Sequence, residues 1–286
     1  MGIDGNGRLP LLGNHGRNRR RLVGIVSGYL SNMKMTFVEK LRGPRPLLGT
    51  IVSLPSPELS EPLSLTGFDW LFVDMEHGAM SIGDAQRMLQ AIKNDCNAII
   101  RVAENNPVLI KQALDIGADG VIVPLVNTAA EAQQAVASAR YPPVGKRSVG
   151  IARAHHYGLH FTDSIQQANQ SVAVIIQIEH QEAIHNLDEI LAVEGIDGVF
   201  IGPYDLSASM NRPGDVSSLA VQAAIQEVKS KCAHKGIPIG LFLPQVDQVK
   251  AEIASGTKFL AVGTDTFFVW SGAQRVVEAF KAALAG

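Results

Sequence analysis

Residues Val172–Asp205 read VAVIIQIEHQEAIHNLDEILAVEGIDGVFIGPYD. An almost continuously apolar run ends at Glu179, a helix-length segment follows, and a second apolar run leads to Asp205. Short runs of this kind are typical of parallel strands buried on both faces. The stretch therefore predicts a strand–helix–strand unit with a carboxylate at the carboxyl end of each strand, and the two acids lie 26 positions apart.

The same alternation of apolar runs and helix-length segments extends over most of the chain. Eight apolar, β-branched runs are predicted as strands: Leu47–Leu54, Trp70–Asp74, Ala98–Val102, Gly120–Pro124, Val172–Glu179, Gly198–Gly202, Ile237–Leu243 and Phe259–Gly263. Helices are predicted between and after them, at Ala85–Lys93, Val108–Ile116, Ala132–Arg140, Gln181–Val193, Leu219–His234, Gln245–Ala254 and Ala273–Leu284. Ser81 with Asp84, and Thr128 with Glu131, have the spacing of capping boxes.

Eight strands alternating with helices predict an α/β fold of the (β/α)₈ TIM-barrel type. The alternative is a doubly wound open sheet. Two observations speak against it, because no G-x-G-x-x-G motif follows any strand and the β-rich segments number eight.

Composition narrows the class of protein. The chain has 286 residues, of which 46% are hydrophobic and 18% charged, and its net charge of −2 predicts no general attraction to nucleic acid or to an anionic membrane. No apolar run reaches the roughly 18 residues of a membrane helix. Cys96 and Cys232 form neither a disulfide framework nor a zinc-binding spacing, which favours a reducing, cytoplasmic setting.

The first 34 residues differ from the rest, since they carry five arginines and a single acid, Asp4. This composition fits a transit peptide, or an over-extended start with Met33 or Met35 as the initiator. We expect an amino-terminal extension over residues 1–34, poorly packed or peripheral, and a single barrel domain over residues 35–286.

Polar residues gather where the predicted strands end. In a TIM barrel the carboxyl ends of all strands form one rim, and active sites lie there. The candidates at this rim are Asp74, His77, Arg101, Gln177, Glu179 and Asp205. Because side chains alternate along a strand, Gln177 and Glu179 share a face with Ala173 and Ile175 and are predicted to point into the barrel mouth.

Glu179 and Asp205 are predicted metal ligands. Two carboxylates leave most of an octahedral shell to water and substrate, which is how Mg²⁺ or Mn²⁺ is usually held. The alternative is a pair of helix-capping carboxylates. Lysine is absent from the fifth and sixth predicted strands, so a Schiff-base route lacks an obvious nucleophile, and a metal that polarises a keto group and stabilises an enolate fits better.

Arg101 and His77 admit both a structural and a catalytic reading. Arg101 could pair with a neighbouring acid such as Asp74, or clamp a carboxylate or developing oxyanion, and the two roles are compatible. His77 could be a general base or only a structural hydrogen bonder.

Two further features have open readings. The segment with Arg153, His155, His156 and Tyr157 either lines the mouth or is a solvated loop. Asp115 lies in the last turn of a predicted helix, where the macrodipole disfavours negative charge.

Several motifs resemble one known family. They are FDWLFVDMEHG, KQALDIGADGVIVPLVNT, ARYPPVGKRSVG, IIQIEH and GVFIGPYDLSASM, and the resemblance covers about Leu47 to Val269. The chain resembles the HpcH/HpaI aldolases, which are class II pyruvate aldolases such as 4-hydroxy-2-oxoheptanedioate aldolase and 2-dehydro-3-deoxyglucarate aldolase.

The resemblance implies a barrel of the phosphoenolpyruvate/pyruvate-binding type, with its last helix exchanged between subunits of a homohexamer built as a trimer of dimers. It implies a divalent metal ion (Mg, Mn or Co) on Glu179 and Asp205, bound by the keto and carboxylate oxygens of pyruvate. It also implies the remaining roles: backbone amides of Tyr204 and Asp205 hold the substrate carboxylate near Gln177, Arg101 stabilises the enolate, His77 is the base, Asp115 of a neighbouring subunit raises its basicity, and Asp74 helps to orient it.

Four positions depart from the common pattern of that family. Ile51 stands where many members have Trp, Ser148 and Asn211 stand where Gly is common, and Tyr204 replaces the Ala of some members. In the family the Trp at the position of Ile51 lies near the acceptor aldehyde. The identity of the acceptor aldehyde is therefore not predicted for this chain.

The expected function is reversible cleavage of a 4-hydroxy-2-oxo acid to pyruvate and an aldehyde by a carbon–carbon lyase. One alternative is a relative that decarboxylates oxaloacetate and adds the enolate to an acceptor, as macrophomate synthase does. Another is a barrel kept as a binding or scaffold protein, which has no need of the full set of polar rim residues.

Overall fold

A computed structural model describes residues 34–93 and 95–285 of the chain. Residues 36–286 belong to one compact unit. The amino-terminal extension expected over residues 1–34 lies almost entirely outside the described residues. Among the residues described, no helix has both the length and the apolar character needed to cross a membrane.

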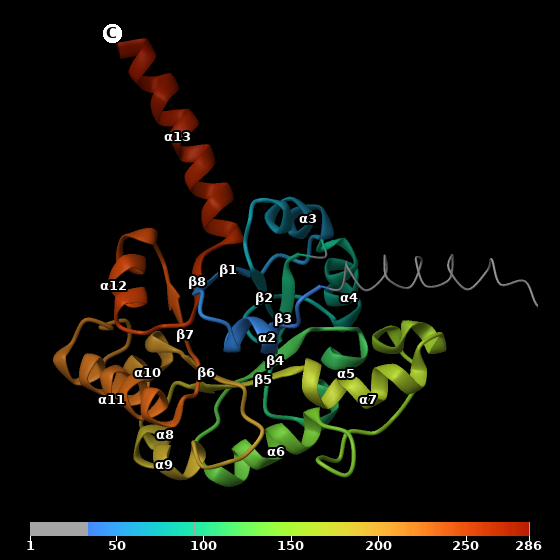
Figure 1. Ribbon diagram of the computed structural model, residues 1–286. Helices are drawn as coiled ribbons and strands as arrows, with labels where there is room; N and C mark the ends of the chain where they lie inside the picture. Colours follow the sequence, from blue (N-terminus) through green and yellow to red (C-terminus); the bar gives the residue numbers. More distant parts are fainter. Residues whose placement is uncertain (1–33, 94, 286) are drawn as a thin grey trace, which may run out of the picture. The chain divides into compact units, whose positions relative to one another are not determined.

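Eight parallel strands close into a barrel in sequence order, β1 to β8 (Figure 1). Their bounds are β1 Leu47–Val52, β2 Trp70–Asp74, β3 Asn97–Arg101, β4 Gly120–Val123, β5 Ala173–Ile178, β6 Gly198–Ile201, β7 Ile239–Leu243 and β8 Phe259–Thr264. The (β/α)₈ prediction is confirmed, and each predicted strand agrees with the structure to within two residues at either end. The later start of β7 has a simple cause, since Pro238 lacks the N–H that a strand residue donates.

The helices surround the barrel (Figure 1). They are α2 Phe37–Arg42, α3 Pro57–Leu65, α4 Ile82–Ala91, α5 Pro107–Asp115, α6 Ala129–Ala139, α7 Phe161–Ser171, α8 Gln181–His185, α9 Leu187–Ile190, α10 Pro203–Ser209, α11 Leu219–Lys235, α12 Val249–Ala254 and α13 Asp265–Ala285, with 3₁₀ turns η1 Arg153–Gly158 and η2 Val246–Gln248. Both predicted capping boxes form. The helix predicted over 181–193 is divided at Asn186, whose φ of −96° and ψ of 10° are not helical.

The barrel interior is packed with aromatic rings, and Phe37 of α2 closes its base. The Phe37 ring lies 5.5 Å from that of Trp70, which contacts Phe72, Phe200 and Phe259. Facing glycines make room for these rings, since a Cβ added to Gly49 would lie 2.5 Å from Trp70. The interior is therefore a filled core, and a ligand can bind only above it, at the rim.

Strand parity places the polar residues of β5 as expected. Ala173 and Ile175 belong to the inner core, whereas Val174, Ile176 and Ile178 belong to the layer between strands and helices. Gln177 and the residue after the strand, Glu179, are therefore on the inner side, above the aromatic core.

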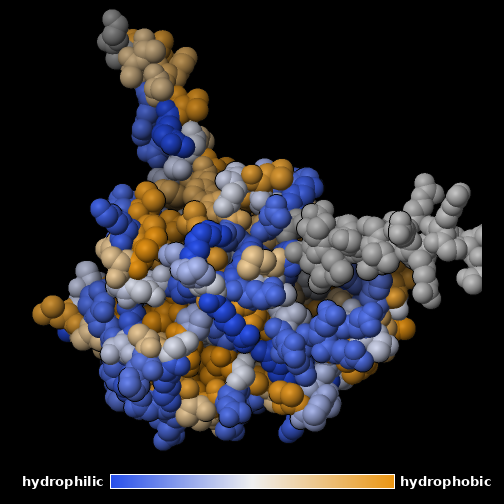
Figure 2. Space-filling view, viewed as in Figure 1, coloured by the Kyte–Doolittle hydropathy of each residue, from blue (hydrophilic) through white to orange (hydrophobic). Residues whose placement is uncertain are grey.

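The last helix, α13, covers little of its own barrel. Its first residue, Asp265, is fully buried and accepts hydrogen bonds from the backbone of Ser53 and Leu54. Every residue from Ala273 to Leu284, in contrast, is exposed, and α13 points away from the barrel (Figure 1). Hydrophobic side chains line this helix beside a hydrophilic strip (Figure 2).

Candidate active site at the carboxyl-terminal rim

Asp74 and Arg101 form a buried ion pair at the ends of two neighbouring strands. They are partners in the register of β2 and β3. Arg101 donates from Nε to Oδ1 of Asp74 at 2.9 Å and from Nη2 to Oδ2 at 2.7 Å, so one carboxylate engages one whole edge of the guanidinium. Burial opposes the charge of Arg101, but its hydrogen bonds to Asp74 together with the negative charges of Asp74, Glu76 and Glu179 outweigh this effect and raise its pKa.

Glu76 is a rim residue that the sequence reasoning did not select. Its Oε2 lies 3.0 Å from Nη1 of Arg101, so the guanidinium contacts a second carboxylate. Oδ1 of Asp74 accepts from the backbone N–H of Glu76 and of His77, at 3.1 and 3.3 Å, and so shapes the turn that presents both. Burial raises the pKa of Glu76 despite Arg101. Its position two residues beyond a rim acid, on the same side of the chain by strand parity, could have identified it.

His77 lies on the exposed part of this turn. Asp74 contacts it through the backbone N–H, and both oxygens of that carboxylate are engaged by Arg101. Asp74 therefore fixes where the His77 residue stands on the rim rather than holding its imidazole ring.

Glu179 is a deeply buried acid of the rim, with 2% of its surface exposed. Its Oε1 accepts from the backbone N–H of Leu125 at 2.8 Å, and its Oε2 accepts from the Gln177 amide. Burial, with the negative charges of Glu76 and Asp205, raises the pKa of Glu179 to about 7. The buried Oε1 of Gln177 accepts no hydrogen bond from the described residues.

Asp205 and Tyr204 stand in the first turn of α10, where both are exposed. The charge of Asp205 contributes to the raised pKa of both Glu76 and Glu179, so the three carboxylates face a common region. Gly202, just before α10, leaves the space that Glu179 occupies, because a Cβ there would lie 2.9 Å from Oε2 of Glu179.

These residues fit a hard divalent cation. The side-chain donors are oxygens, which Mg²⁺ and Mn²⁺ prefer. Asp74, Glu76, Glu179 and Asp205 share this rim with one guanidinium. Burial is the main cause of the raised pKa values of Glu76 and Glu179, and repulsion from neighbouring carboxylates adds to it. Within residues 34–93 and 95–285, no three His, Cys, Asp or Glu side chains are grouped closely enough to hold a metal ion.

Asp115 lies away from this rim. It ends α5, directly before β4, and therefore lies at the amino-terminal end of the barrel. Within the chain its Oδ1 accepts from Nη2 of Arg147 at 2.6 Å, which accounts for an acid at a helix carboxyl terminus. A role for Asp115 at the rim would require a second copy of the chain.

The segment before α7 does not line the mouth. His155 is buried with its Nε2 2.9 Å from the Tyr141 hydroxyl, and Arg153 donates to the carbonyl of Ile116. Both contacts are at the amino-terminal end, because Ile116 precedes β4. The mouth-lining reading was thus wrong for these two residues, while His156 and Tyr157 are exposed in a left-handed backbone conformation with φ of 50° and 56°.

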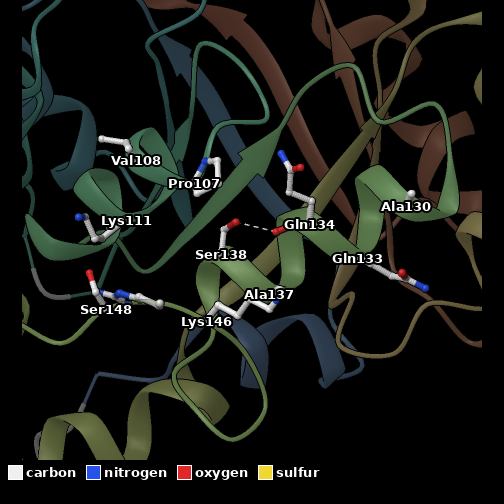
Figure 3. A pocket seen from close by; sticks show the side chains of 11 residues that line it. Pro107, Val108, Lys111, Ala130, Gln133, Gln134, Ala137, Ser138, Lys146 and Ser148 are labelled. Carbon is white, nitrogen blue, oxygen red and sulfur yellow. Dashed lines mark hydrogen bonds between the residues drawn. The ribbon is translucent and has the colours of Figure 1, made fainter.

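A groove of about 560 Å³ lies between α5 and α6, with Lys111, Gln134, Lys146 and Ser148 among its lining residues (Figure 3). It contains none of the predicted site residues and no carboxylate. The rim, with its polar side chains, is therefore the candidate site, and this groove is not.

The departures from the family pattern are now located. Ile51 packs partly buried on the inner core. The Tyr204 ring lies 6.3 Å from that of Phe242. Asn211 has a φ of 58°, a left-handed conformation that Gly and Asn adopt most readily, and Ser148 is exposed in the α5–α6 groove.

A closed barrel of eight parallel strands defines a protein of the (β/α)₈ class, in which active sites lie at the carboxyl-terminal rim. Sequence comparison is more specific: residues 48–271 match the HpcH/HpaI aldolase/citrate lyase family, and the chain belongs to this family. The protein is accordingly a carbon–carbon lyase.

Individual relatives agree with this assignment. The 5-keto-4-deoxy-D-glucarate aldolase of Shigella dysenteriae is 39% identical over 236 residues, which are 82% of this chain and 92% of the relative. A HpcH/HpaI family protein from Burkholderia cenocepacia superposes with a TM-score of 0.83 at 31% identity, over 86% of this chain and 98% of that one. Macrophomate synthase superposes with a TM-score of 0.75 at 26% identity, over 88% and 91% of the two chains.

Proposed function

We propose that this protein is a divalent-metal-dependent aldolase that cleaves a 4-hydroxy-2-oxo acid reversibly to pyruvate and an aldehyde. One observation carries the proposal: the buried Glu179 carboxylate, with Asp205 nearby, shares its rim with the Arg101 guanidinium. The developing enolate carries negative charge. A cation held by two carboxylates and a fixed guanidinium can stabilise that charge from two sides.

Glu179 and Asp205 would hold the metal ion, which we take to be Mg²⁺, Mn²⁺ or Co²⁺. When bound, such an ion polarises the 2-keto group and offsets charge that develops on its oxygen. Gln177 and Leu125 already fix the two oxygens of Glu179, so that carboxylate is held in one orientation before any ligand arrives.

The substrate carboxylate would bind at the start of α10, against the backbone amides of Tyr204 and Asp205. The first N–H groups of a helix lack partners within the helix and suit an anion. The orphaned Oε1 of Gln177 lies close by and can accept from a hydroxyl or a water.

In the cleavage direction His77 would take the proton of the C4 hydroxyl. The freed oxygen pair forms the aldehyde C=O, the C3–C4 bond breaks and its electron pair forms the C2–C3 double bond, the C2=O π pair moves to the 2-keto oxygen, and the aldehyde leaves. Arg101 stabilises the resulting enolate oxygen, and a proton delivered to C3 completes pyruvate. Condensation is the reverse of these steps.

The relative at 39% identity is named for a keto-deoxy sugar acid, which supports a sugar-acid-derived 2-oxo acid as the substrate class. Ile51, in place of a larger aromatic residue, would leave more room on the aldehyde side.

We further propose a homo-oligomer, a hexamer built as a trimer of dimers, in the cytoplasm. Its support is α13, whose hydrophobic residues from Val269 to Leu284 are exposed in the described part of the chain, and Asp115, which can reach a rim only in another subunit.

Chelation tests the proposal. We expect exhaustive EDTA treatment to abolish cleavage of a 4-hydroxy-2-oxo diacid, and Mg²⁺, Mn²⁺ or Co²⁺ to restore it. A panel of aldehydes with pyruvate and each metal would then define the acceptor. Activity that survives EDTA and is trapped by borohydride with pyruvate would show a Schiff base and overturn the proposal.

A second candidate is decarboxylation of oxaloacetate with addition of the enolate to an acceptor. The likeness to macrophomate synthase over 88% of this chain favours it. Product analysis with oxaloacetate and a pyrone, against a 4-hydroxy-2-oxo diacid, separates the two reactions. A His77→Ala variant with unchanged turnover on every 2-oxo acid tested would contradict both.

A further inference from the structure

We propose that Glu76 is a positioning residue for the reaction: by holding Nη1 of Arg101 it fixes the guanidinium plane that faces the reacting oxygens. This inference rests on the proposed aldolase function, because it assumes that Arg101 contacts the enolate oxygen.

Asp74 alone holds only one edge of Arg101. Its two oxygens bond to Nε and Nη2, which form the side of the guanidinium nearest β2. Three of the five N–H groups of an arginine remain after these two bonds, on Nη1 and Nη2. A planar group held along one edge can still tilt about that edge.

Glu76 and Phe72 restrict this tilt from two further directions. The Phe72 ring lies below the guanidinium, 5.1 Å from its carbon atom, and supports its face. Glu76 Oε2 lies 3.0 Å from Nη1, on the nitrogen that Asp74 does not engage. The guanidinium thus has one held edge, one supported face and one charged contact at its free end.

The Glu76 contact is mainly electrostatic. The buried Oε2 accepts no hydrogen bond of good geometry from the described residues, although it lies within ion-pair distance of Arg101. Asp74 and Asp205 both repel this carboxylate. An acid kept half-buried against two like charges destabilises the fold unless its contact with Arg101 compensates, which favours a role in placing that side chain.

Loss of this contact should affect the transition state more than the ground state. The enolate oxygen carries its charge only as the C3–C4 bond breaks, so a displaced guanidinium lowers kcat while KM changes little. A misplacement near 1 Å can cost about 100-fold in rate.

The test measures enolate formation by itself. Exchange of the pyruvate methyl protons in D₂O with Mg²⁺, followed by ¹H NMR, needs no aldehyde. We expect Glu76→Gln to slow exchange and kcat for cleavage by roughly 10- to 100-fold with KM within about threefold. The matched control is Glu104→Gln, which removes the same charge from an exposed residue just after β3 and should leave both rates unchanged.

A double-mutant cycle separates positioning from a direct or structural role. If Glu76 acts through Arg101, Glu76→Gln should add little to the loss already caused by Arg101→Lys. Glu76→Asp keeps the charge with a shorter reach, so its exchange rate and kcat should lie between those of wild type and Glu76→Gln. If Glu76→Gln fails to fold, Glu76→Asp provides the test instead.

The two possible failures differ. A wild-type protein that exchanges no pyruvate protons with metal present overturns the proposed function, and this inference with it. If the wild type exchanges pyruvate protons normally, two results would overturn the inference alone. One is an exchange rate of Glu76→Gln within twofold of wild type. The other is a double variant in which the losses from Glu76→Gln and Arg101→Lys multiply.

Discussion

The buried Glu179 carboxylate makes the stability of the metal-free protein depend on pH. Burial raises its pKa from an ordinary value near 4.5 to about 7, so the folded state binds this proton more tightly than the unfolded state does. Between these two pH values the free energy of unfolding therefore falls as pH rises, by an amount on the order of 3 kcal/mol at most. Above pH 7 the loss is complete, unless a cation compensates the charge.

We expect the melting temperature in EDTA to fall from pH 5 to pH 8, and Mg²⁺ or Mn²⁺ to raise it more at pH 8 than at pH 6. Calorimetry across this range measures both. Glu179→Gln should weaken the response to pH in this window, to which the raised pKa of Glu76 also contributes, and should remove most of the response to metal. An equal pH slope in the variant would assign the titration to another group.

Gly202→Ala should weaken metal binding without unfolding the protein. Its new methyl group would lie 2.9 Å from Oε2 of Glu179, so the carboxylate has to move. Displacing a metal ligand by such a contact typically costs about 10- to 100-fold in affinity. Titration with Mn²⁺ measures it, with Gly83→Ala as the control, since a Cβ there meets nothing closer than 3.7 Å. Unchanged Mn²⁺ affinity would argue against Glu179 as a ligand.

The sequence located the rim acids other than Glu76 and offered Asp74 as a partner of Arg101, but it did not predict the remaining contacts. Strand parity predicted the inward direction of Gln177 and Glu179 because alternation is a local property of the backbone. The contact between Arg101 and Glu76 depends on where a turn places a side chain beyond its strand. The partner of Asp115 was missed for the same reason, as Arg147 lies 32 positions away on an irregular segment.

At the scale of elements, the end of α10 explains one departure from the family pattern. Asn211 follows the helix with a φ of 58°. Asn tolerates this conformation better than other residues with a Cβ, so it can replace the Gly common in the family.

We expect Asn211→Val to lower the free energy of unfolding by roughly 1–2 kcal/mol, because a β-branched residue is strained at positive φ. Asn211→Gly should lie within about 1 kcal/mol of wild type, since relief of strain offsets greater freedom of the unfolded chain. Urea denaturation of the three proteins provides the values. Equal stability of the Val variant and wild type would contradict this account.

Regular elements were predictable where periodicity and caps agreed, as in α4 and α6 with their capping boxes. Short elements were not. The six residues of α2 carry too little periodicity to be recognised, although Phe37 fills the base of the barrel. The break at Asn186 has no Gly or Pro to signal it in the sequence, and there the Asn186 side chain donates to the carbonyl of Asn127.

At the scale of the whole molecule, the apolar face of α13 is the surface that still has to be explained. Its hydrophobic residues recur at helical spacing on one face, namely Val269, Trp270, Ala273, Val276, Val277, Phe280 and Leu284, whereas Gln274, Arg275, Glu278 and Lys281 lie on the other. Periodicity predicted this helix only from Ala273, whereas α13 begins at Asp265, and it could not predict what the apolar face packs against, because that face is exposed in the part of the chain that the structure describes. Phe280 is 65% and Val276 71% exposed.

An exposed apolar helix face of this length is covered in a stable protein, and a second copy of the chain is the partner that our proposal requires. Val276→Asp with Phe280→Asp should therefore dissociate the assembly, because two charges cannot be buried unpaired at its centre. Light scattering after size exclusion measures the mass, and Arg275→Asp on the polar face should leave it unchanged. If Asp115 also acts in a neighbouring subunit, the dissociated variant should lose activity while its far-ultraviolet circular dichroism stays that of a folded barrel. A wild-type protein that runs as a monomer would contradict the oligomer, whereas a dissociated variant with full activity would contradict only the shared site.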